Sequence, residues 1–419
     1  MKLMVRIMQI LGRAGRLLGY LLISPFLILI PRNSRKIVFG AWSGKQFSCN
    51  PKYLFQYLSR QADFICVWIG EEALRDEVLK TPHAVFARKG SLLAFWHCLT
   101  ARFYVYNVNW REDIINFPRC RRVELIYTTH GYADKNVGIR QFSGEGAPIH
   151  PPKVFQSLRD VLNKLEDMLF GSESWCSESS EQGVEIRLSN QPFIVSRERM
   201  LRFGKPRADY FIANKGCSVE HQRQKEKIAR ALGIPSSKTW YVFAPTWRHD
   251  DTKVFSVASM SQRDGLVRLL ERQDAIIIEK QHPIVLRRRT APVAFKDGIL
   301  VLSLEQSRLI DTQELLMSSD RLITDYSSIY YDFVLLNRPV IHFAYDYADF
   351  MDKEMGFNYD IRHYGGGPFA YSENELIAYM GMSDEELLQR RNRATLCDHL
   401  TYERGTACES YYKFLKERR

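Results

Sequence analysis

Short apolar runs alternate with longer amphipathic stretches along most of the chain, starting near Lys36. The runs are rich in β-branched and aromatic residues, which is typical of buried strands, and several are separated by stretches with helical spacing, such as Asn50–Ser59. Strands joined by crossover helices form a parallel sheet that is covered on both faces. In the first half of the chain, strands are predicted at Ile37–Gly40, Phe64–Ile69, Ala84–Ala87, Phe103–Tyr106 and Glu124–Tyr127.

A second series of strands follows a charged helix predicted over Glu220–Leu232. That helix should end at Gly233, since glycine with Pro235 just beyond is the usual stop signal. Two doubly wound, Rossmann-like α/β domains are therefore expected, and the carboxyl ends of their strands should face a shared cleft, where such folds bind ligands. The later strands are predicted at Tyr241–Ala244, Ala275–Ile278, Ile299–Leu302, Arg321–Thr324 and Pro339–Phe343. We assign residues 1–33 to an N-terminal segment, 34–216 to the first domain and 217–419 to the second.

The N-terminal segment has a composition of its own. An apolar run, Leu17–Ile30, follows several basic residues, but it is shorter than the roughly 20 residues that span a bilayer. Pro25 would kink or end a helix there, and no small-residue cleavage site follows. We expect a membrane-associating helix that lies on an anionic membrane surface, with a tilted transmembrane helix or a buried core helix as alternatives.

Composition fits a folded protein of two domains. The chain has 419 residues, 45% hydrophobic and 26% charged, with a formal net charge of +11, which favours nucleic acid, acidic lipids or a phosphorylated substrate as partners. The eight cysteines form no CxxC pair and no metal-ligand spacing, so a reduced, cytosol-facing protein is expected. The basic clusters Arg119–Arg122 and Arg287–Arg289 lack interleaved aromatic residues, so solvated or lipid-facing surface is favoured over nucleic-acid binding.

The turn Thr324–Ser328 is the most informative segment for chemistry. It follows the predicted strand ending at Thr324 and precedes an apolar helix over Ile329–Leu336. Free backbone N–H groups at a helix start, together with the hydroxyls of Ser327 and Ser328, bind phosphate well. The alternative is that one of these serines only caps the helix.

Two histidines stand just past predicted strands, one in each domain. His130 follows the strand at Glu124–Tyr127, and His282 follows the one at Ala275–Ile278. Imidazole takes a proton from an alcohol near neutral pH or donates a hydrogen bond to a phosphoryl oxygen. A structural hydrogen bond is the alternative for each, but their equivalent positions at the cleft favour a catalytic pair.

Further polar residues follow the same strand ends. Arg207, Arg248 and Lys280 would neutralise a pyrophosphate, although a solvated loop is the alternative for Arg248. Pro245 and Thr246 lie in the turn before Arg248. No GxGxxG, Walker A, HExxH or GxSxG pattern is present, and no carboxylate pair has metal-ligand spacing, so no cofactor and no metal are expected.

From Lys36 to the C-terminus, an ordered set of motifs resembles the CDP-glycerol glycerophosphotransferase family of teichoic acid and capsule polymer synthesis. Each motif is weak alone, but their order and internal spacing are specific. They are Val38–Gly40 with Gly44, Lys45, Asn50 and Pro51; His130, Gly131, Lys135 and Gly138; Gly204, Pro206, Arg207 and Asp209; Phe243–Arg248; Lys280, His282 and Pro283; Thr324–Ser328 with Asp332, Arg338, Pro339, Tyr345 and Asp346; and Gly356, Phe357, Gly367 and Pro368.

The resemblance implies a glycosyltransferase-B architecture, a membrane-associating N-terminus and a nucleotide-alditol donor bound mainly by the second domain. It implies donor contacts by His130, Gly131, Arg207, Pro245, Thr246, His282, Pro283, Ser327, Ser328 and Asp332. We add Lys135, Arg248, Lys280, Thr324 and Asp325 as substrate-binding candidates. The family usually has Trp before its motif histidine and Thr-Pro after the glycine, whereas Thr129, Tyr132 and Ala133 stand here, which leaves the substrate more open than the reaction.

The expected reaction is transfer of glycerol phosphate from CDP-glycerol to a hydroxyl of a lipid-linked teichoic acid or capsule polymer, with release of CMP, at the cytoplasmic face of a bacterial membrane. His130 is the candidate base, and His282 and Arg207 would stabilise the phosphoryl oxygens. The alternatives are CDP-ribitol as donor, a nucleotide-sugar glycosyltransferase of the same architecture, and a non-catalytic module that binds polyanions or membranes.

Overall fold

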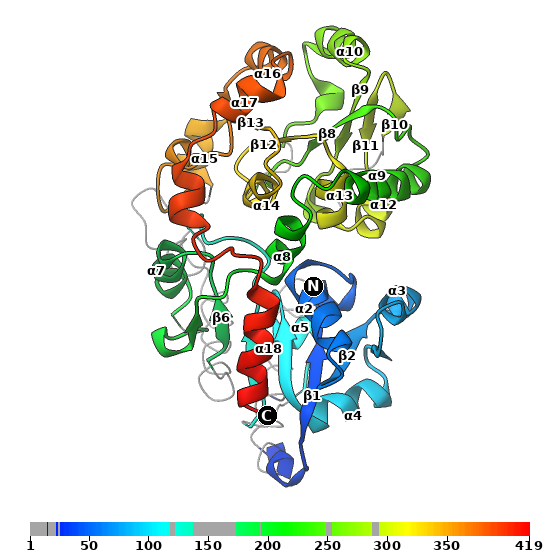
Figure 1. Cartoon of the computed structure of the whole chain (residues 1–419), viewed down its shortest axis with the longest axis vertical. Coiled ribbons are helices and arrows are strands. Elements are labelled where there is room, and N and C mark those ends of the chain that lie inside the picture. Colours follow the sequence, from blue (N-terminus) through cyan, green and yellow to red (C-terminus); the bar gives the residue numbers. More distant parts are fainter. Residues whose placement is uncertain are drawn as a thin grey trace.

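The computed structural model describes residues 15, 22, 23, 26–117, 122–136, 173–192, 194–248, 254–286, 293–354 and 356–419. Two seven-stranded sheets lie in separate halves of the molecule (Figure 1), in the orders β3-β2-β1-β4-β5-β6-β7 and β10-β11-β9-β8-β12-β13-β14. Neighbouring strands pair in parallel, except that β10 and β11 are antiparallel. The expected architecture of two doubly wound domains is therefore confirmed.

The first sheet contains all five strands predicted for it. Successive residues of its strands enter different cores: Ile37 and Phe39 of β1 pack on one face, and Val38 packs on the other. Both faces are thus covered, which explains why the strands read as continuous apolar runs. The strands are β1 (Asn33–Phe39), β2 (Ile65–Gly70), β3 (Val85–Arg88), β4 (Ala101–Tyr106), β5 (Glu124–Tyr127), β6 (Trp175–Ser177) and β7 (Met200–Leu201). The helices of this part are η1 (Phe26–Leu29), η2 (Trp42–Gly44), α2 (Cys49–Arg60), η3 (Glu72–Leu74), α3 (Arg75–Leu79), α4 (Leu92–Thr100), α5 (Trp110–Asp113), α7 (Glu181–Asn190), η5 (Arg197–Arg199) and α8 (Pro206–Ala213).

The second sheet likewise contains the five strands predicted for it. Its strands are β8 (Thr239–Phe243), β9 (Ala275–Glu279), β10 (Val293–Lys296), β11 (Ile299–Val301), β12 (Arg321–Thr324), β13 (Val340–Phe343) and β14 (Phe369–Ala370). The helices are α9 (Ser218–Leu232), η7 (Val257–Ser259), α10 (Arg263–Arg272), α11 (Pro283–Leu286), α12 (Leu304–Leu309), α13 (Thr312–Ser318), α14 (Ile329–Leu335), α15 (Tyr347–Lys353), η8 (Ile361–His363), α16 (Glu373–Met380), α17 (Asp384–Gln389), the π-helical turn η9 (Thr395–His399) and α18 (Ala407–Glu417).

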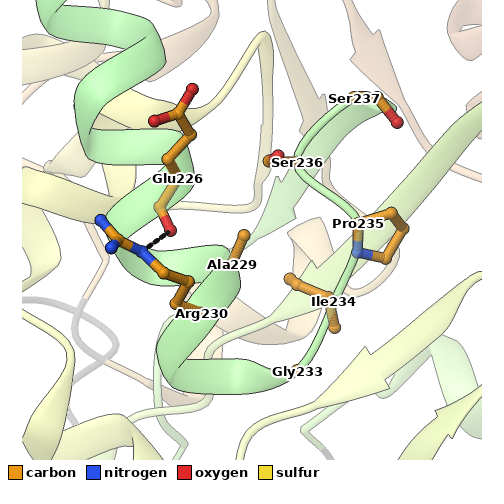
Figure 2. Close-up of a pocket in the computed structure, with 8 residues that line it drawn as sticks. All are labelled: Glu226, Ala229, Arg230, Gly233, Ile234, Pro235, Ser236 and Ser237. Carbon is orange, nitrogen blue, oxygen red and sulfur yellow. Dashed lines mark hydrogen bonds between the residues drawn. The ribbon is translucent and has the colours of Figure 1, made fainter.

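Helix α9 ends where the sequence predicts. Gly233 adopts a left-handed conformation (φ 67°) and its N–H donates to the Ala229 carbonyl, which closes the helix. Figure 2 shows the chain turning at Gly233 and leaving through Pro235, beside a shallow surface depression. This turn redirects the chain into β8, the first strand of the second sheet.

The last helix, α18, returns to the first domain. Cys408, Tyr411 and Leu415 pack into the same core as Ile37, and Figure 1 shows α18 beside the first sheet. Asp209 of α8 fixes the start of α18, because its carboxylate accepts the N–H groups of Ala407 (3.0 Å) and Cys408 (2.8 Å). The chain thus crosses between the domains twice, before α9 and again before α18.

The expected N-terminal anchor, Leu17–Ile30, falls largely outside the described residues. Of its described part, Leu27 is buried in the first domain's core, whereas Phe26 and Leu29 are 67% and 78% exposed. In the portion of the chain that the structure describes, no helix is long and apolar enough to cross a membrane. The cysteines described are all free thiols; Cys120, Gly138, Arg119, Arg121 and Arg287–Arg289 lie outside the described residues.

Candidate functional site

A cavity of about 470 Å³ lies between the two domains and is lined by both of them. Its walls follow the carboxyl ends of β1, β4 and β5 on one side and of β8, β9 and β12 on the other, as the topology predicts. The predicted site residues that line it are His130, Lys135, Arg207, Pro245, Thr246, Lys280, His282, Ser327, Ser328 and Asp332. Among the described side chains and glycines, those predicted but not lining it are Gly131, Arg248, Thr324 and Asp325, and the side chain of Pro283 lies outside the described part.

His130 stands at the first-domain wall, just after β5. Its Nδ1 lies 3.4 Å from the Asn107 carbonyl oxygen; because a carbonyl only accepts, Nδ1 carries the proton in this contact and Nε2 keeps its lone pair. The surrounding protein removes hydration from the ring and lowers the pKa of His130 to about 4, and positive charge on Arg187, Arg207 and His282 acts in the same direction. The ring faces the cleft, and the lowered pKa keeps the imidazole neutral at pH 7.

The backbone before His130 is held in an uncommon conformation. Thr129 has φ 58°, in the left-handed region that non-glycine residues rarely adopt. Asn50 donates to the Thr128 and Thr129 carbonyls at 2.9 and 3.1 Å, and the Lys205 ammonium donates to the Thr129 hydroxyl at 3.0 Å. These hydrogen bonds hold Thr129 in its left-handed conformation and so place His130 at the cavity wall.

His282 stands on the facing wall, just after β9. Its ring lies against Trp247, with the ring centroids 6.4 Å apart, and on the opposite wall Trp42 lies against His130 at 5.3 Å. Lys280 adds a cation to this wall; its ammonium donates to the Ser307 carbonyl (2.7 Å) and hydroxyl (3.1 Å) and to the Ile310 carbonyl (3.2 Å). Burial lowers the pKa of Lys280 to about 8, and the Asp311 carboxylate opposes that shift.

Ser327 and Ser328 lie at the start of α14 and face the cavity. In the described part of the chain, the Ser328 side chain accepts no cap hydrogen bond from the helix, which removes the main support for a purely capping role. The first domain approaches this turn closely, because a Cβ added to Gly131 would come within 2.9 Å of the Ser328 hydroxyl oxygen. Gly131 therefore permits the domains to close over the turn.

Arg207 and Asp332 are partners of each other across the domain boundary. Arg207 Nε lies 2.9 Å from Asp332 Oδ2, and both side chains are buried. Arg207 also donates to the His130 carbonyl (2.7 Å), and the Tyr132 hydroxyl donates to Asp332 (3.0 Å). The pair thus connects the histidine loop of the first domain to helix α14 of the second.

The structure places Arg248, Thr324 and Asp325 beneath the cavity, as scaffold of the second domain. Arg248 is fully buried and pairs with Asp325 and Asp346, both at 2.9 Å, so it is neither a solvated loop residue nor part of the cavity wall. Asp325 also accepts the Thr246 N–H at 2.8 Å, and the Thr324 hydroxyl donates to the Ala244 carbonyl at 2.7 Å. These bonds fix the turn that carries Pro245 and Thr246.

Lys135 reaches the cavity from a segment that pairs with the second domain. It forms a β-bridge with Phe357, and Asn358 N–H donates to the Asp134 carbonyl at 3.0 Å. Burial lowers the pKa of Lys135, and the carboxylates of Asp134 and Asp325 oppose the shift. Within the described residues its ammonium makes no hydrogen bond, so it is available to an anionic ligand.

Sequence patterns did not identify several residues of the wall. Trp42 and Ser43 contribute from a turn after β1 in which both have positive φ (49° and 59°), and Arg308 contributes from α12. The available sequence signal for Trp42 and Lys45 was that an aromatic and a basic residue directly follow a predicted strand. The described residues contain no cluster of three His, Cys, Asp or Glu side chains that could hold a metal ion.

Two Rossmann-like domains that face each other across a polar cavity, with a histidine on each wall and a hydroxyl-rich turn at a helix start, define a transferase of the glycosyltransferase-B architecture. Over residues 22–416 the chain matches the family described as CDP-glycerol:poly(glycerophosphate) glycerophosphotransferase. The chain therefore belongs to this family and is an enzyme, as the motifs predicted.

Relatives include enzymes named for glycerol phosphate and for ribitol phosphate. The chain is 27% identical to the teichoic acid poly(glycerol phosphate) polymerase of Bacillus spizizenii, covering 83% of this chain and 84% of that protein. It is 26% identical to the teichoic acid glycerol-phosphate transferase of Staphylococcus aureus, covering 84% and 85%. It is 30% identical to the teichoic acid poly(ribitol-phosphate) polymerase of Bacillus spizizenii, covering 84% of this chain and 51% of that protein.

Among solved structures, the wall teichoic acid polymerase TagF has the same fold. It superimposes with a TM-score of 0.73 at 20% sequence identity, covering 97% of this chain and 98% of that one. A TagF variant in which one histidine is replaced by asparagine, soaked with CDPG, superimposes equally well. The likeness establishes the fold and agrees with the two-domain arrangement seen here.

Proposed function

We propose that this enzyme transfers glycerol phosphate from CDP-glycerol to a hydroxyl of a membrane-linked teichoic acid or capsule polymer and releases CMP. The observation that carries the proposal is the cavity itself, in which a neutral histidine of the first domain faces a histidine, a lysine and two serines of the second. Family membership and the CDPG used with TagF support this donor.

In the proposed reaction, the acceptor hydroxyl attacks the β-phosphorus of the donor while its proton passes to Nε2 of His130. A new oxygen–phosphorus bond forms, the bond from the β-phosphorus to the bridging oxygen breaks, and CMP leaves with that oxygen. The carbonyl that binds Nδ1–H keeps the imidazole in the required tautomer. Positioning and charge stabilisation supply most of the acceleration in phosphoryl transfer of this kind.

The second domain is proposed to hold the donor. Ser327 and Ser328 would bind a phosphate together with the backbone N–H groups at the start of α14, and Lys280 and His282 would balance the phosphoryl charge. Lys135 and Arg207 approach the same phosphates from the first domain. Since Asp332 is paired with Arg207, we propose that it orients Arg207, in place of the donor contact that the resemblance implied.

Ribitol phosphate is the second candidate group. The specific observation in its favour is the 30% identity to the poly(ribitol-phosphate) polymerase, against 27% to the poly(glycerol phosphate) polymerase of the same organism. The residues at which the sequence departs from the family pattern, Thr129, Tyr132 and Ala133, are buried and flank His130 and Gly131 in the chain. For location, we propose the cytoplasmic membrane face, with residues 1–33 as the anchor.

The deciding experiment measures CMP release from CDP-glycerol, CDP-ribitol and a set of nucleotide sugars, with bacterial membranes as acceptor. Incorporation of radiolabelled glycerol phosphate into polymer, together with stoichiometric CMP, is the expected result. Faster release from CDP-ribitol would assign the ribitol reaction. Turnover of nucleotide sugars without turnover of either CDP-alditol would overturn the proposal.

A further inference from the structure

Asp113, which the reaction as proposed does not use, is a buried carboxylate behind the first-domain wall. It ends helix α5 and has no exposed surface. Its Oδ2 accepts the backbone N–H groups of Asn107 (3.3 Å), Val108 (2.9 Å) and Asn109 (3.2 Å), and its Oδ1 accepts that of Ser43 (2.8 Å). A group facing four donors is an acceptor on both oxygens, so these contacts favour the ionised carboxylate.

One peptide group joins Asp113 to His130. The N–H of Val108 and the carbonyl of Asn107 belong to the same peptide; the N–H donates to Asp113 at 2.9 Å and the carbonyl lies 3.4 Å from Nδ1 of His130. The contacts form a continuous chain from carboxylate through peptide to imidazole. Hydrogen bonds in such a chain polarise one another, so a negative charge on the N–H side makes the carbonyl a stronger acceptor.

The Asp113 carboxylate also supports Trp42, the aromatic residue beside His130. The Asn107 side-chain oxygen accepts the Trp42 N–H at 3.2 Å, and the Trp42 ring lies against His130. Asp113 thus fixes the turns after β1 and β4, which are neighbouring strands. Both turns contact the imidazole, one through a carbonyl and one through a ring.

We propose that Asp113 is a positioning residue for His130, acting through the Asn107–Val108 peptide to keep Nδ1 protonated and Nε2 free to take the acceptor proton. This inference rests on the proposed role of His130 as the base. It gives the enzyme an aspartate–histidine pair with a peptide group between the two side chains. After proton transfer, the same chain stabilises the imidazolium, as an orienting carboxylate does when it contacts a histidine directly.

The alternative is that Asp113 only joins the two turns. Measuring which nitrogen of His130 carries the proton distinguishes this structural role from the proposed one. We would record ¹⁵N spectra of protein labelled on histidine nitrogen at pH 7, with His130→Gln assigning the signal. The wild-type protein should show Nδ1–H and bare Nε2. Asp113→Asn, which keeps the shape and removes the charge, should shift His130 toward the Nε2–H tautomer, and Asp113→Glu should restore Nδ1–H.

Kinetics complete the test. Asp113→Asn should slow single-turnover CMP release by about 10- to 100-fold, the scale known for groups that orient metal-binding histidines, with CDP-glycerol affinity retained. Glu112→Gln, which removes the exposed neighbouring carboxylate, is the matched control and should change neither tautomer nor rate. An Nε2–H signal in the wild-type protein, which needs no variant at Asp113, or an unchanged tautomer in Asp113→Asn would overturn the proposal. Normal turnover in His130→Gln would instead overturn the role of His130 as base.

Discussion

Arg207 of the first domain and Asp332 of the second form a buried ion pair, with Nε 2.9 Å from Oδ2. Neither charge has access to bulk water, so each depends on the other for compensation. Both residues line the cavity, and Arg207 also donates to the carbonyl of His130. The stability of the closed arrangement and the geometry of the site are therefore linked.

Replacing Asp332 by Ala should leave Arg207 buried without its counter-charge. We expect the free energy of unfolding to fall by about 3–5 kcal/mol, the usual cost of breaking a buried pair by removing one partner. Urea denaturation followed by circular dichroism would measure it. Asp384→Asn is the control, because the Asp384 side chain is 61% exposed in its pair with Arg321 and such a pair should be worth less than about 1 kcal/mol. Equal losses in both variants would contradict this account of the interface.

Replacing Ser327 and Ser328 together by Ala should weaken donor binding by about 1–3 kcal/mol, the scale of hydrogen bonds to charged groups. Melting temperature should change little, because the Ser328 side chain makes no cap bond within the described structure. Titration calorimetry with CDP-glycerol and thermal melting separate the two effects. Ser383→Ala provides the opposite pattern, since Ser383 caps α17 in a full capping box and its loss should cost about 1 kcal/mol of stability.

The two histidines should differ in what they contribute. His130→Ala should lower turnover by roughly 10² to 10⁴, the usual contribution of a positioned proton acceptor, and should retain donor affinity. His282→Ala should weaken donor binding as well as slow turnover, because its wall carries the proposed phosphate contacts. Calorimetry and single-turnover CMP release on each variant would test this. Loss of donor binding in His130→Ala alone would reverse the assignment.

Acid should destabilise the second domain through His342. This buried histidine donates from Nδ1 to the Asp325 carbonyl at 2.9 Å and accepts the Gly366 N–H on Nε2, and burial lowers its pKa from 6.5 to about 4. The unfolded chain therefore binds a proton that the folded one does not between these two values, so stability present above pH 6.5 is lost as pH falls toward 4. Urea unfolding at pH 7 and pH 4.5 would measure the loss, which His342→Gln should reduce.

Removing residues 1–25 should leave a folded enzyme that still releases CMP with a soluble acceptor but loses most activity on membranes. The deletion stops before Leu27, which belongs to the first domain's core. Flotation with anionic vesicles would measure membrane binding. A variant extended to remove Leu27 should be less stable, whereas unchanged vesicle binding after removal of residues 1–25 would contradict the anchor.

The sequence predicted the two sheets because their central strands are buried on both faces and therefore read as apolar runs. It missed β7 and β14, because strands of two residues leave no periodic signal. It also missed β6 and β10, although β11, with three residues, was predicted. It located His130, His282 and the Ser327–Ser328 turn, since each directly follows a strand that ends at the cleft. The role of Arg248 could not be predicted, because an arginine after a strand end can bind either a ligand or buried carboxylates, and here it pairs with Asp325.

The contribution of Asp113 had no sequence signal at all. It accepts hydrogen bonds from backbone N–H groups, which every residue but proline has. The sequence therefore does not indicate which residues are its partners. The same holds for Asp209, which appears within a motif but binds the first turn of α18. Side-chain contacts to the backbone are thus the part of a site that is hardest to predict from sequence.

The return of α18 to the first domain also sets how the two halves can move. Asp209 stands near the first crossing of the chain and binds Ala407 and Cys408 at the second, and Glu403 of the second crossing accepts the Lys205 N–H at 3.1 Å. The two crossings are therefore held together beside α8. Two domains joined by two neighbouring chain segments can rotate about those segments as about a hinge. Rotation around the axis of a single linker is restricted. Opening of the cavity is therefore expected to follow a hinge beside Asp209, and a fusion or truncation at the C-terminus would disturb this hinge before it disturbed the donor-binding sheet.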